Sequence, residues 1–413
     1  MSDLKSTFRS SDPKPGEVYE QIKTAAEENR IEDLRDAMIG NFKEQDQFAE
    51  GRLETFLENL SDFPGARKVV EDYYEKEFDE KIDASNPEEL KEKISSVEDI
   101  INGNALPAVS KDQLRHEFGV EGSWGEEDEI TGQEIPYLAP EWVKEHENEP
   151  HQVVGTSGTT GRPWKRAMTR NDWGYELALS LTMYDEVMEN HDIDPEEANV
   201  ALVMPPGHVA TEVFGEALED LGANVYRPDF SSLEEGGKEA KQEAEKIIGH
   251  INEGEYGAMV SSMANALEGG LGGAIKGGKV DSDLYLNVGH PFYEEHIEVL
   301  EETGADTADI FGETEYPQGG GHRIHKNGEE GFSLPLDAQI NLVLDEETGE
   351  LSKEGEGIFS YFPFALEGQI IPGVYVGGVE ASLDTAEDEE GDYHILSDLE
   401  RVKEPGRSQS YFT

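Results

Sequence analysis

The sequence predicts an α/β protein in which mostly parallel sheets, covered by helices, lie between a helical N-terminal region and a β-rich C-terminal subdomain. Three observations lead to this prediction. Apolar residues recur at three- and four-residue spacing from about Gly16 to Phe118, as on one face of a helix. Short apolar runs then alternate with helical stretches, as in a parallel sheet. From about Phe332 onward, strands dominate. We expect domain boundaries near 1–120, 121–331 and 332–413.

The N-terminal helices are expected to break at two points. Asp62–Gly65 and Ser85–Pro87 each contain a proline, which fixes φ, together with an Asp or Asn that can cap the next helix. The following stretch, Glu121–Pro150, is dense in Gly, Glu and Pro and is expected to form loops.

The central region is expected to alternate strands with helices. Strands are predicted at 199–204, 224–227, 258–261, 284–288 and 306–311, and helices at 171–191, 209–222, 233–252, 262–275 and 292–303. The piece Gly269–Gly278 contains no GxGxxG motif and is expected to be a flexible loop beside a helix. In the C-terminal part, strands are predicted at 339–344, 357–361 and 370–375, with a hairpin turn at Asp345–Gly349.

Charge is the most extreme property of the composition. The 413 residues include 33 Lys+Arg and 92 Asp+Glu, a formal net charge of −59. Such a field repels nucleic-acid phosphates and anionic lipids, so neither nucleic acid nor a membrane is expected as a partner. Because the acids are spread through helical stretches, we interpret the chain as a halophilic protein whose self-repulsion is screened by salt. An ordinary acidic protein is the alternative.

Two absences narrow the chemistry. The sequence has no cysteine, which excludes disulfides, Cys-ligated zinc and a Cys nucleophile. It also has no run of about 18 apolar residues and no apolar signal-peptide core near its start. A cytoplasmic location is therefore expected.

The most informative segment is Gly155–Pro163, which follows the apolar pair Val153-Val154. Its glycines permit close backbone approach, and its hydroxyls and N–H groups can donate to phosphate oxygens. No Lys-Ser/Thr pair follows the final glycine, so it is not a Walker A loop. Residues 162–170 hold four cations, which indicates a positive patch: Arg162, Lys165, Arg166 and Arg170. The alternative is a polar surface turn.

A second segment, Asp309–Glu315, follows a predicted strand, where α/β sheets collect their ligands. Glu315 offers an oxygen ligand for Mg²⁺, Thr314 a hydroxyl for a phosphate, and Phe311 a flat face for a purine. An ordinary acidic turn is the alternative interpretation.

Together the two segments resemble the signatures of one family. Gly155–Pro163 is similar to the phosphate loop of the adenylate-forming (AMP-binding) superfamily, and Asp309–Glu315 to its aromatic-Gly-x-Thr-Glu motif. The sequence most resembles the phenylacetate–CoA ligase-like and acyl-protein synthetase-like branch, over roughly 150–407. Further stretches that fit are Met259–Ala264, Val288–Pro291, and Asp345–Glu350 before Glu354–Gly357.

The resemblance implies the large-domain fold of adenylate-forming enzymes and their chemistry. A carboxylate attacks the α-phosphate of Mg-ATP, giving an acyl-adenylate and pyrophosphate. The resemblance places Thr314 at the α-phosphate, Glu315 on Mg²⁺ and His208 beside the acyl pocket. A plain helix-start residue is the alternative for His208. The remaining nucleotide-binding residues that it implies are Thr156, Ser157, Gly158, Thr159, Thr160, Gly161, Lys165, Gly289, Asp309 and Phe311.

Two departures from the family pattern bear on activity. The family's ribose-binding aspartate has no counterpart in Gly373–Gly378, although Asp398 takes that role under another alignment. The family's C-terminal lid domain is expected to be lacking, since few residues follow Arg407. The acyl acceptor is then CoA or a partner protein, and a partner could also supply the lid. The alternative is a catalytically degenerate nucleotide-binding or scaffolding subunit.

Overall fold

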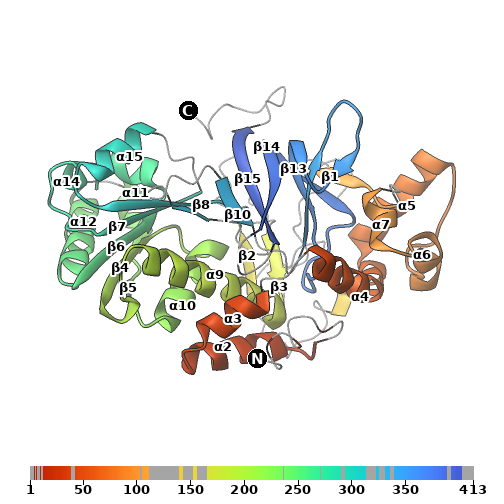
Figure 1. Cartoon of the computed structure of the whole chain (residues 1–413), viewed down its shortest axis with the longest axis horizontal. Helices are drawn as coiled ribbons and strands as arrows, with labels where there is room; N and C mark the ends of the chain where they lie inside the picture. Colours follow the sequence, from red (N-terminus) through yellow and green to blue (C-terminus); the bar gives the residue numbers. More distant parts are fainter. Residues whose placement is uncertain are drawn as a thin grey trace.

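The computed structural model describes the chain except for residues 1–3, 5, 7–9, 11–12, 39–41, 103–104, 111–138, 143–151, 156–164, 236, 270, 290–293, 313–321, 325–330, 335–338, 388–391 and 402–413. In the described residues, thirteen strands join into one sheet with the order β12-β11-β13-β14-β15-β10-β9-β8-β7-β6-β4-β5, and β1 pairs with β14. The sheet spans both halves of the molecule (Figure 1).

One half of the sheet is parallel. Its strands are β4 (Ala198–Val203), β5 (Asn224–Tyr226), β6 (Tyr256–Ser261), β7 (Leu284–Val288) and β8 (Asp306–Ile310). Their apolar side chains alternate between two hydrophobic clusters, so each strand is covered on both faces. The predicted alternation of strands and helices is confirmed here.

Helices cover the two faces of this parallel half (Figure 1). They are α9 (Arg170–Asn190), α10 (Val209–Asp220), α11 (Phe230–Glu235), α12 (Gly237–Asn252), α13 (Met263–Glu268), α14 (Gly272–Ile275) and α15 (Glu294–Glu301), with the 3₁₀ turn η2 (Pro195–Glu197) before β4. Thr169 and Asp172 form a capping box that starts α9. Among the described residues, no helix is both long enough and apolar enough to cross a membrane.

Two predicted helices are each divided in the structure. The helix expected at 233–252 is α11 followed by α12, because Gly237 adopts φ +78 at the start of α12. The helix expected at 262–275 is α13 followed by α14. Gly272 comes so close to α13 that a Cβ there would lie 1.8 Å from the Leu267 carbonyl oxygen. The expectation that Gly269–Gly278 is wholly a loop is therefore wrong, since α14 lies within it.

The C-terminal half is antiparallel and β-rich, as predicted. Its strands are β9 (His322–Ile324), β10 (Gly331–Leu334), β11 (Ile340–Leu344), β12 (Leu351–Ser352), β13 (Gly355–Phe362), β14 (Val374–Glu387) and β15 (Asp392–Arg401). The predicted turn at Asp345–Gly349 joins β11 to β12. The strand predicted at 370–375 is wrong up to Gly373, because Pro372 has no N–H for a ladder and β14 begins at Val374.

The N-terminal helices are distributed over both halves of the molecule (Figure 1). They are α2 (Glu17–Glu27), α3 (Ile31–Met38), α4 (Phe42–Ser61), α5 (Pro64–Phe78), α6 (Pro87–Lys93) and α7 (Val97–Ile101). Helices α2 and α3 pack on α9, whereas α4 packs on β11 of the β-rich half. Both predicted breaks are confirmed, and the Asn86 side chain caps α6.

One strand of this region was not predicted. Strand β1 (Ala108–Ser110) pairs in parallel with β14. Gly373 permits this approach, because a Cβ there would lie 2.0 Å from the Pro107 carbonyl oxygen. The predicted loop at 121–150 and the domain boundary at 120 lie largely in residues outside the description.

Candidate functional site

The candidate site lies at the carboxyl edge of the parallel strands. Val203 of β4, Ser261 of β6, Asn287 of β7 and Asp309 of β8 are paired neighbours across four adjacent strands. Open α/β sheets bind ligands at this edge, where the loops after the strands converge. The predicted Asp309 thus lies near the carboxyl end of β8, with Phe311 directly after this strand and Gly289 directly after its neighbour β7.

Asp309 is held by a buried hydrogen bond. The Asn287 amide nitrogen donates to Asp309 Oδ1 at 2.7 Å, and both side chains are buried. The Asn287 amide oxygen accepts the backbone N–H of Met263 at 3.0 Å. Met263 is the first residue of α13, whose first-turn N–H groups need acceptors outside the helix. The carboxylate of Asp309 is therefore fixed at the sheet edge by neighbouring elements.

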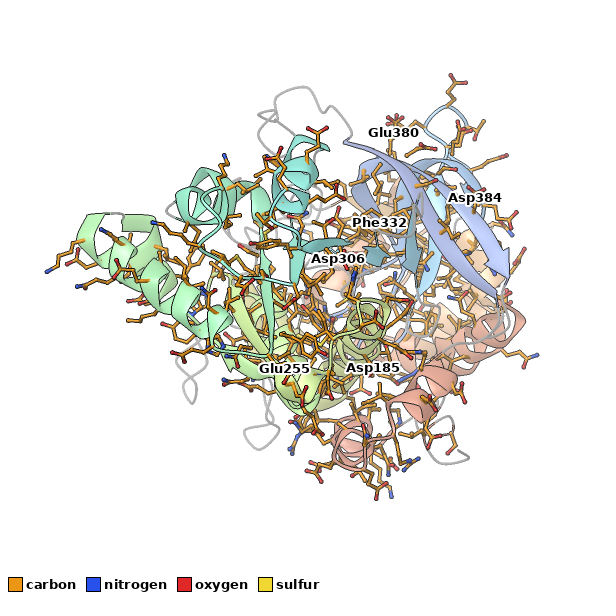
Figure 2. All side chains as sticks on the ribbon, turned by 60° about the vertical axis from the view of Figure 1, so that its left-hand side comes forward. Asp185, Glu255, Asp306, Phe332, Glu380 and Asp384 are labelled. Carbon is orange, nitrogen blue, oxygen red and sulfur yellow. The ribbon has the colours of Figure 1, made fainter. Side chains whose placement is uncertain are left out.

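Phe311 lies directly after β8 and packs against two aromatic rings. Its ring centroid is 5.7 Å from that of Phe332 on β10 and 6.0 Å from that of Phe359 on β13. Figure 2 shows Phe332 between strand β8, which begins at Asp306, and strand β14, which carries Glu380 and Asp384. Phe311 is half-buried, so these contacts support its ring from the protein side.

The predicted phosphate loop connects two strands of a hairpin. Strands β2 (Gln152–Gly155) and β3 (Lys165–Met168) pair antiparallel, with Gly155 opposite Lys165. Thr156, Ser157, Gly158, Thr159, Thr160 and Gly161 lie between these strands, outside the described residues. Thr314 and Glu315 also lie outside them. Their predicted roles at the nucleotide stay predictions.

Two cations of the predicted positive patch are engaged elsewhere. Arg166 on β3 is only 1% exposed, and its guanidinium contacts Glu176 of α9 at 2.7 Å. Arg170 contacts Glu20 at 3.0 Å and lies over the Tyr19 ring. The interpretation of these two arginines as an open positive patch is therefore wrong, because intramolecular carboxylates compensate them. Arg166 instead anchors the hairpin to α9.

A second buried polar cluster joins α4, α9 and the loop between β13 and β14. Glu367 accepts hydrogen bonds from Thr169 at 3.1 Å and from the Asn171 amide at 3.3 Å. The guanidinium of Arg52 on α4 lies 3.8 Å from the Glu367 carboxylate. Asp172 accepts the backbone N–H groups of Glu367 and Gly368. This cluster fixes the start of α9, directly after the hairpin strand β3.

Burial raises the pKa of two glutamates near the β2–β3 hairpin, Glu176 and Glu367. Burial raises the pKa of Glu176 to about 7, partly opposed by Arg166. Burial and the nearby Asp172 likewise raise the pKa of Glu367 to about 7. Both groups lie next to the hairpin that carries the predicted phosphate loop.

These shifts predict a pH-dependent stability. The pKa of Glu176 is 4.5 in the unfolded chain and about 7 in the folded chain. At a pH between these two values, the folded chain holds a proton on Glu176 that the unfolded chain has released. The free energy of unfolding should therefore fall as pH rises through this window, on the order of 2 kcal/mol for this residue between about pH 5 and pH 8. Denaturant unfolding in concentrated KCl should show a smaller fall in Glu176→Gln. The exposed control Glu346→Gln should leave the fall unchanged, and an equal change in both variants would contradict the assignment.

The other predicted site residues have definite positions. His208 is the N-cap of α10, and its Nδ1 accepts the Ala210 backbone N–H at 3.2 Å. It follows β4, so it lies on the same edge as Asp309, and its place beside an acyl pocket stays a prediction. Gly289 has φ +83, a conformation that favours glycine. Lys165 lies on β3, opposite Gly155.

Asp398 lies on β15 at an irregular point of its ladder with β14. Its φ of +51 is unusual for a residue other than glycine, and the register between β14 and β15 shifts there. Two residues before it, Leu396 pairs with Phe332, whose ring contacts Phe311. Its role at a ribose stays a prediction.

Among the described residues, no group of three or more acidic or histidine side chains is arranged to hold a metal ion.

Comparison with solved structures decides the fold. Over 88% of its length the chain superposes on 68% of 2-hydroxyisobutyryl-CoA ligase in the postadenylation state with R3-HIB-AMP, with a TM-score of 0.62 and 16% identity. The same ligase in its thioesterification state with 2-HIB-AMP and CoA matches with a TM-score of 0.60. The chain has the fold of an adenylate-forming ligase. No protein-family model and no curated protein matches the sequence.

Sequence reasoning missed several residues of this region. Asn287 looks like an isolated polar residue in the apolar run Leu284–Val288. The signal that could have found it is its position, because a buried amide stands one residue before the end of a strand that reaches the ligand edge. Glu176 and Glu367 carry no sequence motif, and only the tertiary structure brings them to Arg166 and Arg52.

Proposed function

We propose that the chain activates a carboxylic acid with ATP and passes the acyl group to CoA or to a partner protein. A carboxylate oxygen attacks the α-phosphorus, the bond from that phosphorus to pyrophosphate breaks, and an acyl-adenylate forms. Solved structures of the same fold hold R3-HIB-AMP, and one holds 2-HIB-AMP together with CoA. Such a transfer depends mainly on positioning and charge neutralisation by the site.

The observation that carries the proposal is the junction of β7 and β8. It places Asp309, Phe311 and Gly289 at the carboxyl edge of a sheet with this fold. A purine amino group can donate to the carboxylate of Asp309, and the ring of Phe311 offers a supported flat face. We therefore assign the adenine of the nucleotide to Asp309 and Phe311.

The phosphates are assigned to the segments that adjoin this edge. Thr156, Ser157, Thr159 and Thr160 would donate to the β- and γ-phosphates, with Gly158 and Gly161 in the same loop and Lys165 at the start of β3. Thr314 would contact the α-phosphate. The Glu315 carboxylate is an oxygen ligand of the kind that Mg²⁺ prefers, and bound Mg²⁺ would neutralise phosphate charge.

The test is pyrophosphate exchange into ATP in molar KCl, with a panel of aryl and aliphatic carboxylic acids. We expect exchange that depends on one class of acid.

Glu315→Ala should remove the Mg²⁺-dependent part of ATP binding measured by calorimetry, whereas the exposed control Glu302→Ala should retain it. Equal Mg-ATP affinity in the two variants would contradict the assignment of Glu315.

A second candidate is a nucleotide-binding or scaffolding subunit that does not catalyse the reaction. Gly378 favours it, since it lies on β14 at the position where the family pattern has a ribose-binding aspartate. This candidate predicts ATP binding without exchange for any acid in the panel. Acid-dependent exchange would exclude it.

A further inference from the structure

Three polar residues form a row across the carboxyl edge of the parallel sheet. Ser261, Asn287 and Asp309 are direct neighbours on β6, β7 and β8, and all three side chains are buried. Laterally paired residues of a sheet point to the same face. This face is the one that α13 covers, since Met259 and Tyr285 of the same strands pack in one cluster with Met263.

Two hydrogen bonds indicate the orientation of the Asn287 amide. Its oxygen accepts the Met263 N–H at 3.0 Å, and its nitrogen donates to Asp309 at 2.7 Å. The reversed amide would place its NH₂ group against an N–H and its oxygen against a carboxylate. Both contacts would then be repulsive, so only one orientation satisfies the site.

A fixed carboxylate is a selective acceptor. A carboxylate has about four acceptor positions, and the bond from Asn287 uses one of them at Oδ1. A ligand that brings an N–H donor to this carboxylate gains a hydrogen bond, whereas one that brings a carbonyl oxygen meets repulsion. Selectivity of this kind requires that the carboxylate keep its place when the ligand changes.

We propose that Asn287 is a positioning residue that holds the Asp309 carboxylate and thereby sets the preference of the site for a 6-aminopurine over a 6-oxopurine. This inference rests on the proposed function, because it assumes that a purine nucleotide binds at this edge. It adds to that function a residue outside the two sequence motifs, which acts through Asp309 and through the first turn of α13. Asn287 itself need not touch the nucleotide.

The experiment compares equilibrium binding of Mg-ATP and Mg-ITP to the full chain in molar KCl. Asn287→Leu keeps a similar side-chain volume but has neither an acceptor for the Met263 N–H nor a donor to Asp309. Asn287→Ala removes both without burying a charge. We expect the ratio of ATP to ITP affinity to fall at least about tenfold in each variant, which is the effect of losing a hydrogen bond to a charged group. A purely structural role would weaken both nucleotides equally and leave the ratio unchanged.

The matched control is Asn341→Leu, which makes the same replacement at another fully buried asparagine, on β11. Its ratio should equal that of the unaltered chain. An unchanged ratio in both Asn287 variants, an equal fall in the control, or no preference for ATP in the unaltered chain would each overturn the inference while leaving the proposed function intact. Binding of neither nucleotide to the unaltered chain would overturn the proposed function and the inference with it.

Discussion

Replacing Arg166 with methionine is expected to lower the free energy of unfolding by about 3–5 kcal/mol at about pH 8. The side chain of Arg166 is 1% exposed and that of its partner Glu176 is 4% exposed, so the substitution leaves a carboxylate buried without its counter-charge. Methionine retains much of the volume of arginine, so the loss measures the charge more than a cavity. Denaturant unfolding in concentrated KCl provides the measurement.

Two comparisons separate this effect from general disruption. At about pH 5 the cost should be smaller, because Glu176, with a pKa of about 7, is then protonated in the folded chain. The double variant Arg166→Met/Glu176→Leu should recover most of the loss, since an apolar pair of similar volume often replaces a buried ion pair without cost. A double variant as unstable as the single one would show that packing, not charge, dominates at this position.

Lowering the salt concentration from about 1 M to about 0.01 M KCl should reduce the melting temperature by at least about 10 °C. The screening length grows from about 3 Å to about 30 Å over this range, which exposes the carboxylates to one another. The chain has 92 carboxylate side chains and only 33 Lys and Arg side chains to pair with them. Lys91, for example, contacts Glu54, Glu58 and Glu88 at once, and acidic side chains project from the periphery in Figure 2.

Changing the solute in the buffer tests whether loss of charge screening causes the fall in melting temperature. Sucrose at matched osmolality adds no screening, so it should restore little of the melting temperature, whereas any monovalent salt at about 1 M should restore most of it. A melting temperature that is the same at both ionic strengths would contradict the interpretation of the chain as halophilic.

The parallel half of the fold could be predicted closely because each of its strands and helices leaves a pattern of apolar residues in its own short stretch of sequence. The strand expected at 284–288 has those bounds in the structure, since strands buried on both faces are continuous apolar runs. Strand β1 could not be predicted in the same way. Its three residues carry no strand pattern, and they pair with Val374–Val376 only because Gly373 allows the two segments to approach.

The candidate site was predictable where the sequence carries motifs and not where partners are distant. The resemblance to the family's aromatic-Gly-x-Thr-Glu motif points to Asp309 and Phe311, and the structure places Asp309 near the carboxyl end of β8 and Phe311 directly after that strand. Arg166 was misinterpreted because a count of charges in sequence does not reveal that Glu176 meets it inside the fold. Asn287 was missed because its function depends on two contacts, neither of which lies near it in the sequence.

The distribution of the N-terminal helices over both halves has a consequence for synthesis on the ribosome. The Gln45 side chain donates to the Gln339 carbonyl, 294 residues further along the chain, and Phe56 of α4 packs on Phe362. At about 5–20 residues per second, α4 emerges roughly 15–60 s before these partners exist. During that interval its apolar face, with Leu53, Phe56, Leu57 and Leu60, has no sheet to cover it. Helices α5, α6 and α7 can pack on α4 soon after it is made, but the packing of α4 on the sheet must wait until most of the chain has been synthesised.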